Sequence, residues 1–381
     1  MRIAMIGQKG VPAKQGGVER HVEELSARLV EMGHEVTVFT RPNYTDPKLE
    51  SHRGITLKSL PTVGTKHLDA IVHSVISSLV AAREDFDVVH YHAIGPCLAS
   101  PVSRVAGKSV VATIHARDWQ RAKWGTAATY ALRVAEKAAL TVPNKTISVS
   151  GSLAAEYADE GRDVVYIPNG VTIEPEQDLA VLEELGIEAG NYVVFAGRLV
   201  PEKGVHHLLA AWDRLGFPMP LVIVGDESHS GDYSETLHDM SAGAVFAGFR
   251  SGPSLGALFR NAALFVLPSD LEGLPIVLLE AVAYGVPVLA SDIPPNKEIL
   301  GDKGVYFHAG SVDSLTESLD RCLGDLDELG AKASAMRLEA LEEYDWDRVA
   351  EATAGLYSEL VGVSAHGVTS RTGFVESGES R

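Results

Sequence analysis

The stretch PSDLEGLPIVLLEAVAYGVPVLASDIPPNKEIL, residues 268–300, decides the fold. Immediately before it, the apolar run Leu264–Leu267 predicts a short buried strand of a parallel sheet. Pro268 and Ser269 end this strand, and Pro275 stands where a proline favours the first turn of a helix. Because ligands of open α/β sheets bind at the carboxyl ends of the strands, we expect a binding site in this strand–loop–helix unit.

Two carboxylates mark the expected site, Glu272 in the loop and Glu280 inside the helix. Glu280 is flanked by apolar residues, and an unpaired buried carboxylate is costly, so we expect it to have a partner or to line a cleft. Free backbone N–H groups and the positive end of the helix favour an anion. The residues at this helix start are Gly273, Leu274, Pro275 and Ile276. Since carboxylates bind hydroxyls and a helix end binds phosphate, the stretch predicts a sugar nucleotide as the ligand.

Two cations upstream complete the expected anion site. Arg198 follows Gly197 at the end of a predicted strand, and Lys203 opens the next helix. An arginine presents a fork of donors to phosphate and a lysine presents a point charge, so together they can neutralise a diphosphate leaving group. For an isolated R-x4-K pattern, the alternative is a surface ion pair with Glu202.

The E-x7-E spacing followed by AYGVPVLASD, together with GRLVPEKG, resembles the donor site of retaining glycosyltransferases of family 4, which have the GT-B fold. The resemblance extends over about residues 1–360. It implies that Glu280 holds ribose hydroxyls and that Glu272 holds a hydroxyl of the donor sugar. It also implies that Arg198 and Lys203 stabilise the diphosphate, with the backbone amides after Gly273 on the phosphates. A capped helix with one snorkelling glutamate is the alternative for the E-x7-E spacing alone.

The first half of the chain adds glycines and a polar loop. Gly16 and Gly17 lie between a predicted strand and a helix, where glycine lets the backbone approach a ligand closely. Their spacing is not the dinucleotide-binding fingerprint. The resemblance implies that Gly17 faces the donor diphosphate and the acceptor, and that His115 lies near the transferred sugar. Asp118, three residues later, is a candidate to orient or deprotonate an acceptor hydroxyl.

Apolar strands alternate with helical periodicity along the 381 residues, which predicts α/β architecture with two domains and parallel sheets. The resemblance implies two Rossmann-like domains that face a central cleft. We expect an acceptor-binding domain over residues 1–172 and a nucleotide-sugar-binding domain over residues 190–344. Residues 345–361 would form a crossover helix that packs on the first domain. Residues 362–381, rich in Ser, Gly and Thr without periodicity, predict a disordered tail.

Composition argues against several other classes of protein. The net charge of −18 argues against nucleic-acid binding. Cys97 and Cys322 are too few for a disulfide framework and, with no secretory signal, predict a cytoplasmic protein. The D-x-D pairs that begin at Asp85 and Asp345 look like capping residues, and no zinc spacing is visible. We therefore expect no catalytic metal and no cofactor besides the nucleotide sugar.

The functional prediction is a retaining glycosyltransferase of cell-surface polysaccharide synthesis. The segments KGVPAKQGGVERHVEEL and DWQRAKWG resemble rhamnosyltransferase-type members of the family. The resemblance therefore makes dTDP-rhamnose the expected donor, and a glycan or polyprenyl-diphosphate-linked acceptor the expected partner. A GT-B sugar-nucleotide epimerase and a non-catalytic nucleotide-sugar-binding protein are the alternatives.

An uneven distribution of charge predicts an anionic membrane surface as a further partner. Residues 1–170 hold 20 basic and 17 acidic side chains, whereas the remainder holds 13 and 34. Bases gather between residues 117 and 145, where Trp119 and Trp124 accompany them. We expect peripheral binding at the inner face of the cytoplasmic membrane, and a helix whose bases pair with local acids is the alternative. The bases are Arg117, Arg121, Lys123, Arg133, Lys137 and Lys145.

Overall fold

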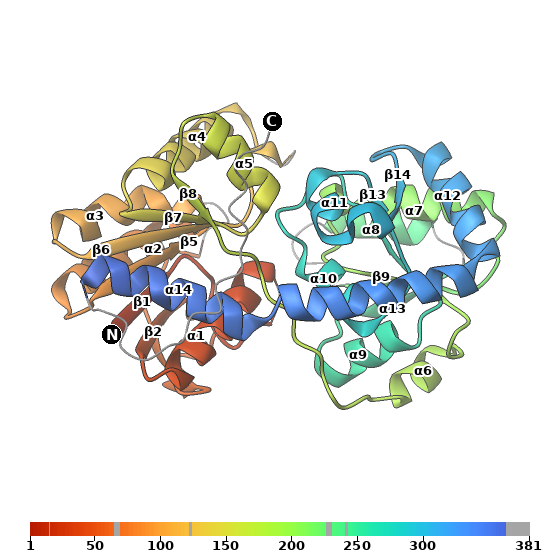
Figure 1. Cartoon of the computed structure of the whole chain (residues 1–381), viewed down its shortest axis with the longest axis horizontal. Helices are drawn as coiled ribbons and strands as arrows, with labels where there is room; N and C mark the ends of the chain where they lie inside the picture. The colour runs from red at the N-terminus through yellow and green to blue at the C-terminus, as the bar shows by residue number, and fades with distance from the viewer. Residues whose placement is uncertain (15, 65–68, 122–123, 226–230, 241–242, 363–381) are drawn as a thin grey trace, which may run out of the picture.

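The structure, a computed structural model, describes residues 1–14, 16–64, 69–121, 124–225, 231–240 and 243–362. It contains two α/β domains, each with a central sheet that helices cover (Figure 1). The expectation of two Rossmann-like domains with parallel sheets is confirmed. From residue 363 onward, the segment expected to form a disordered tail lies outside the described residues.

The first sheet has eight strands in the order β3-β4-β2-β1-β5-β6-β7-β8, and all its pairs are parallel except β3 with β4. The strands are β1 (Arg2–Ile6), β2 (Glu35–Thr40), β3 (Ser51–His52), β4 (Ile55–Ser59), β5 (Val88–His92), β6 (Ser109–Ile114), β7 (Lys145–Ser148) and β8 (Val164–Tyr166). Strand β5 is buried along its whole length, as expected for a parallel strand covered on both faces. The α-helices are α1 (Gly17–Glu31), α2 (Asp69–Arg83), α3 (Ser100–Val105), α4 (Thr126–Thr141) and α5 (Gly151–Asp159), with short 3₁₀ helices η1 (Gly95–Ala99) and η2 (Asp118–Gln120).

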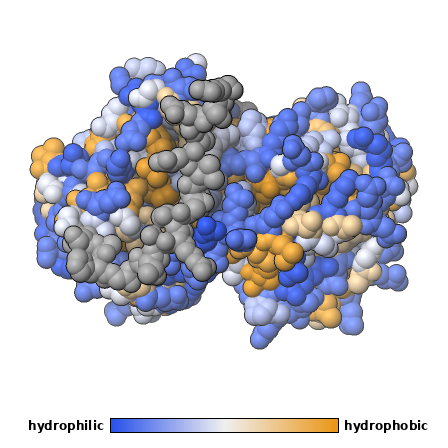
Figure 2. Space-filling model, in the orientation of Figure 1, coloured by the Kyte–Doolittle hydropathy of each residue, from blue (hydrophilic) through white to orange (hydrophobic). Residues whose placement is uncertain are grey.

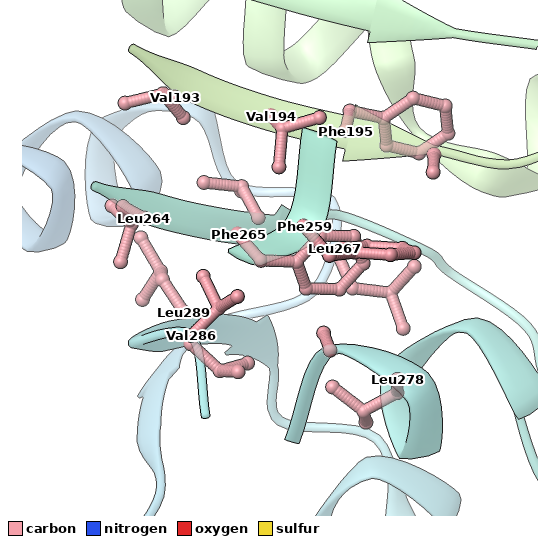
Figure 3. Close-up of a cluster of buried hydrophobic side chains, with 14 of the residues drawn as sticks. Val193, Val194, Phe195, Phe259, Leu264, Phe265, Leu267, Leu278, Val286 and Leu289 are labelled. Atoms are coloured by element: carbon pink, nitrogen blue, oxygen red, sulfur yellow. The ribbon is translucent and has the colours of Figure 1, made fainter. Parts of the chain in front are cut away.

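The second sheet has six strands in the order β11-β10-β9-β12-β13-β14, and all its pairs are parallel. They are β9 (Val193–Ala196), β10 (Leu221–Val224), β11 (Ala244–Gly248), β12 (Leu264–Leu267), β13 (Val288–Ser291) and β14 (Val305–Phe307). Helices α7 (Val205–Arg214), α8 (Gly231–Met240), α9 (Gly252–Arg260), α10 (Ile276–Tyr284), α11 (Pro294–Leu300) and α12 (Val312–Gly324) accompany them, with 3₁₀ turns η3 (Pro201–Lys203) and η4 (Gly301–Lys303). Figure 3 shows part of its apolar core, in which the ring of Phe259 meets that of Phe265, and Leu278 and Leu289 belong to the same cluster.

Two long helices connect the domains. Helix α13 (Leu326–Glu343) lies on the second domain, and α14 (Trp346–Val361) returns along the first (Figure 1). Asp345 caps α14 by accepting hydrogen bonds from the backbone N–H groups of Asp347 and Arg348. Trp346 is buried in the same apolar cluster as Val22 of α1, so α14 joins the core of the first domain. Among the described residues, no helix is both long and apolar enough to cross a membrane.

One helix lies between the ranges 1–172 and 190–344 expected for the two domains, in an acidic segment. Helix α6 (Ala180–Leu185) buries Val181 and Leu182 against the core of the second domain and ends at Gly186, which has a left-handed φ of 64°. The segment is short and strongly acidic, so its helical periodicity is weak. A helix of this length is not stable by itself, and its packing against α9 stabilises it.

Candidate functional site

A pocket of about 150 Å³ opens where β9, β10 and β11 end, on the side that faces the first domain. It brings together three of the predicted site residues, namely Gly16 from the first domain and Gly197 and Arg198 from the second. Its other walls are Ala196, Val224, Gly225, Phe249, Arg250, Leu255 and Val277. Because Val277 belongs to the first turn of α10, the pocket adjoins the strand–loop–helix unit that the sequence singles out.

Glu280 has the partner that its apolar surroundings require. Its side chain is buried, and Oε1 lies 3.2 Å from Nη2 of Arg20, on α1 of the first domain. Burial raises the pKa of Glu280, and the positive charge of Arg20 opposes that shift. Burial also lowers the pKa of Arg20, but Glu280 and neighbouring carboxylates outweigh it, so the net pKa is raised. The ion pair therefore crosses the boundary between the domains.

Lys203 and Glu272, predicted from separate motifs, form one ion pair. Lys203 Nζ donates to Glu272 Oε1, and both side chains are largely buried. The Ser269 hydroxyl donates to the same oxygen at 2.7 Å. Glu202 is the alternative partner that the isolated motif suggests, but the described ion pair of Lys203 is with Glu272. Hence a cation and an anion sit side by side at the carboxyl ends of β9 and β12.

Arg198 is held without a close counter-ion. No ion pair links its guanidinium to another described residue, and burial together with the positive charge of Arg121 lowers its pKa. Glu202, Glu272 and Glu19 oppose that shift from both domains. A half-buried guanidinium with unsatisfied charge at the wall of a pocket is suited to an anionic ligand.

The loop before α10 touches the first domain closely. A Cβ placed on Gly273 would lie 1.7 Å from the carbonyl oxygen of His115, so only glycine fits there. A Cβ on Gly17 would meet the side chain of Ile276 at 3.7 Å. Pro275 is the N-cap of α10, and the first N–H that bonds within the helix start is that of Leu278 to the Pro275 carbonyl. The N–H groups before it face the cleft end of the helix.

His115 belongs to a buried histidine cluster beneath this contact. Its Nε2 lies 3.4 Å from Nδ1 of His92, and its ring meets that of His21 edge-on at 4.8 Å. His90 stacks beside His92 but bonds to Thr113 and Tyr357, which places it in the core rather than at the cleft rim.

The tautomer of His21 follows from its neighbours. Asn169 Nδ2 donates to the Leu274 carbonyl at 2.8 Å, so its Oδ1 faces Nδ1 of His21, also at 2.8 Å. An amide oxygen only accepts, so Nδ1 carries the proton and Nε2 keeps a bare lone pair. That Nε2 has no hydrogen-bond partner among the described residues. Asn169 thus links the donor loop to the histidine cluster.

The ligand nitrogens of His21, His92 and His115 lie within 4.8 Å of one another, so among the described residues this group could hold a metal ion. Neutral imidazoles whose orientation is fixed by an amide suit Zn²⁺ in principle. No local sequence motif indicates this cluster, because its members come from three separate segments. Metal-free transfer stays a prediction.

Asp118 and the basic segment are more heavily paired than expected. Asp118 Oδ1 lies 3.1 Å from Arg121 Nη2, so this carboxylate is not free. Arg117 contacts three carboxylates, those of Glu136, Glu156 and Glu160. Lys145 pairs with Asp163, and Lys123 lies outside the described residues. Local acids therefore neutralise part of the expected basic face, as the alternative of locally paired bases proposes. Arg133 and Lys137 are exposed and form no ion pair with a described carboxylate.

The buried histidines predict how stability depends on pH. Burial lowers the pKa of His21 and of His73 to about 4, and lowers those of His90, His92 and His115 well below the ordinary value. Below about pH 6.5 the histidines of the unfolded chain bind protons, whereas these histidines in the folded chain stay neutral. Their contribution to the free energy of unfolding is therefore fully present above that pH and is lost as the pH falls toward 4. Each histidine contributes at most roughly 1.4 kcal/mol to the stability change per pH unit.

We therefore expect the melting temperature to fall steeply between about pH 7 and pH 5. His21→Gln, which can still bond to Asn169, should flatten that slope, whereas the control His308→Gln at a largely exposed histidine should not. A melting temperature that does not change over this range would contradict the interpretation.

Four residues of the site are missed by the sequence analysis: Arg20, His21, Asn169 and Glu298. Arg20 and His21 follow the glycine pair within about one helical turn, which is the signal that could have found them. Asn169 reads only as a turn residue. Glu298 of α11 accepts hydrogen bonds from the backbone of Gly151 and Ser152 at the start of α5, which joins the domains at a second place.

Two protein-family models match this chain. Residues 15–175 match the model described as Glycosyltransferase Family 4, and residues 181–335 match the model of Glycosyl transferases group 1. The phosphatidyl-myo-inositol mannosyltransferase of Mycobacterium leprae is 30% identical, covering 94% of this chain and 96% of that protein. An alpha-maltose-1-phosphate synthase of Mycolicibacterium smegmatis is 28% identical, covering 94% of this chain and 100% of that protein.

Solved structures share the fold. A sucrose-phosphate synthase from Thermosynechococcus elongatus superimposes with a TM-score of 0.81 at 21% identity, covering 95% of this chain and 100% of that one. An Anabaena protein crystallised with UDP and glucose gives a TM-score of 0.78 at 20% identity, covering 94% and 100%. At these identities the likeness establishes the arrangement of two domains.

Proposed function

This chain belongs to the GT-B glycosyltransferases of group 1 and family 4, and we propose that it transfers a sugar with retention from a nucleotide-diphosphate donor to a glycan or lipid-linked acceptor. The observation that carries the proposal is the convergence of Arg198, the Lys203–Glu272 pair and the start of α10 beside His115. The acceptors would belong to cell-surface polysaccharide synthesis, and the enzyme would work in the cytoplasm at the inner face of the membrane.

The donor would lie along the edge of the second domain. Arg198 and Lys203 would neutralise the diphosphate, and the N–H groups at the start of α10 would contact its oxygens. Glu280 would hold the ribose hydroxyls, and its ion pair with Arg20 supports this role because the positive charge opposes the neutralisation that burial favours. The pocket walls Phe249 and Leu255 offer apolar surface to the base.

At the reacting carbon we propose a front-face displacement. The bond from the anomeric carbon to the leaving phosphate oxygen breaks, and the acceptor oxygen bonds to the same face of the sugar. The departing phosphate oxygen takes the acceptor's proton, so no enzyme nucleophile is needed. Glu272 would hold a sugar hydroxyl, His115 would contact the transferred sugar, and Asp118 would orient the acceptor after exchanging its Arg121 partner.

Release of nucleoside diphosphate separates this proposal from its rivals. A transferase should release it in proportion to acceptor and should form a glycosylated product. An epimerase would isomerise the donor or release nucleotide without acceptor, and a binding protein would do neither. The decisive measurement is a panel of nucleotide sugars incubated with and without a polyprenyl-diphosphate-linked acceptor. Release of nucleoside diphosphate at the same rate with and without acceptor would overturn the proposal.

For the donor, we propose dTDP-rhamnose on the strength of the first-domain segments that resemble rhamnosyltransferases. The named relatives instead include mannosyltransferases and a maltose-1-phosphate synthase. We expect dTDP-rhamnose to raise the melting temperature more than GDP-mannose or UDP-glucose does, because a ligand that binds only the folded state stabilises it by mass action. A larger shift with either competitor would reverse the choice of donor and leave the transferase class intact.

A further inference from the structure

Helix α2 exposes several apolar side chains to solvent and buries several polar ones. Its apolar residues Ile71, Val75 and Leu79 are 45%, 40% and 40% exposed. These three positions follow a spacing of four residues, so they form one stripe along the helix. The residues that it buries include His73 and Ser77, which are polar. A helix on a soluble surface normally presents the opposite pattern.

Hydrogen bonds hold the helix in this orientation. The Ser78 hydroxyl lies 2.7 Å from the Tyr91 hydroxyl, and Tyr91 in turn contacts Ser103. His73 Nε2 lies 3.1 Å from the Thr40 carbonyl. Rotating the helix to bury its apolar stripe would leave these buried polar groups unpaired, which costs more than the exposed apolar area. The stripe is thus a fixed feature of the surface.

The exposed stripe continues onto neighbouring elements. Helix α2 packs on η1 and α3, and α4 packs on η1, all on the side of the sheet opposite α14. Val105 of α3 is 90% exposed and Tyr130 of α4 is 72% exposed. On the side that it shows, Figure 2 has small groups of hydrophobic residues at the outer edge of this domain, among hydrophilic ones. We call this surface the apolar face, and its members are Ile71, Val75, Leu79, Leu98, Val105, Tyr130 and Val134.

The rim of the apolar face is positively charged. Its acids turn inward, since Asp69 pairs with Arg41 and Glu136 pairs with Arg117. The exposed charged residues on the same helices are Arg83, Arg104, Arg133 and Lys137. None of these four forms an ion pair with a described carboxylate. An apolar surface with a basic rim complements an anionic lipid headgroup layer over acyl chains.

We infer that the apolar face docks this enzyme on an anionic bilayer. The inference rests on the proposed function only for the lipid-linked acceptor, because the surface itself is defined without the active site. It extends the contact from residues 117–145, which include α4, to α2, η1 and α3, and apolar burial becomes the main attraction. Tyr130 would sit at the interface, where amphipathic rings are favoured. Since η1 follows the carboxyl end of β5, the face borders the cleft that a lipid-linked acceptor would enter.

The test is co-sedimentation of the full chain with phosphatidylcholine vesicles, with and without phosphatidylglycerol. We expect binding to the anionic vesicles, and a loss of about tenfold or more in the triple variant Ile71→Gln, Val75→Gln, Leu79→Gln. Arg133→Glu with Lys137→Glu should weaken binding mainly at low salt. The matched control is Leu338→Gln, at a leucine of α13 that is 70% exposed, and it should bind as the wild type does.

Donor release with a soluble acceptor should be unchanged in every variant, so failure of docking and failure of the proposed transfer are distinguishable. Equal binding of the wild type and the triple variant would overturn the inference. Wild-type dimerisation that the triple variant loses, without any vesicle binding, would overturn it in favour of a second copy of this chain. Because all the substituted side chains are exposed, we expect the variants to fold, and their melting temperatures check this.

Discussion

Gly273→Ala should reduce kcat/KM by about 100-fold or more, because misplacing the reacting groups by about 1 Å can cost that much. The added Cβ would lie 1.7 Å from the His115 carbonyl oxygen and 2.9 Å from its carbon. A Cβ has no rotamer with which to escape, and the obstacle is backbone. The two domains would therefore have to separate at the point where the donor loop meets His115.

The loss of activity in Gly273→Ala should come from the contact between the two domains and not from unfolding of either domain. Gly273 is absent from the glycines with left-handed φ, so alanine is compatible with its own backbone conformation. Each domain should fold as before, and the melting temperature should change little. Small-angle scattering should report a larger radius of gyration in the variant, while donor affinity falls less than kcat.

Two glycines supply controls for this variant. At Gly330 in α13 and Gly355 in α14, an added Cβ would meet no described heavy atom within 4 Å apart from the local backbone of its own helix. Alanine should be tolerated there, and it favours the helix by about 0.5–1 kcal/mol. Wild-type activity in Gly273→Ala would mean that the contact with His115 is not part of the active arrangement.

Local sequence patterns predict those parts of the molecule whose structure depends on neighbours in the chain. The run Leu264–Leu267 is wholly buried in β12, and Pro275 caps α10 as its position suggests. Both are decided within a few residues, by an apolar run and by a proline. The polar motif residues Gly197, Arg198, Lys203 and Glu272 also lie at strand ends, because parallel topology gathers those ends at one edge.

Features that depend on distant pairing are not visible in the sequence. Glu280 clearly needs a partner, but nothing local identifies Arg20, which lies 260 positions earlier in the chain. The histidine cluster is assembled by three segments, and Asn169 connects it to the Leu274 carbonyl across the domain boundary. Periodicity also shows the apolar stripe of α2, yet it cannot tell which side faces the core. Only the buried hydrogen bonds of Ser78 and His73 decide that.

Arg198→Ala should lower kcat/KM by about 100-fold or more and leave the fold intact, since removing a preorganised donor to developing charge costs about 3 kcal/mol. Arg198 has no ion pair with a described residue, so its loss strands no buried carboxylate. Arg198→Lys should recover only part of the rate, because a point charge replaces a planar fork. The matched control is Arg214→Ala, at a half-exposed arginine that pairs with Asp313.

Lys203→Ala should lose activity to a similar degree but should also destabilise the protein, because it leaves the buried carboxylate of Glu272 without its cation. Adding Glu272→Gln should restore the melting temperature without restoring turnover, which separates the structural effect of the pair from its effect on the diphosphate. Kinetics with saturating donor and thermal denaturation of the four proteins in this cycle provide the measurement. If Arg198→Ala and Lys203→Ala both stay within about a factor of two of wild type, these cations do not contact the leaving group.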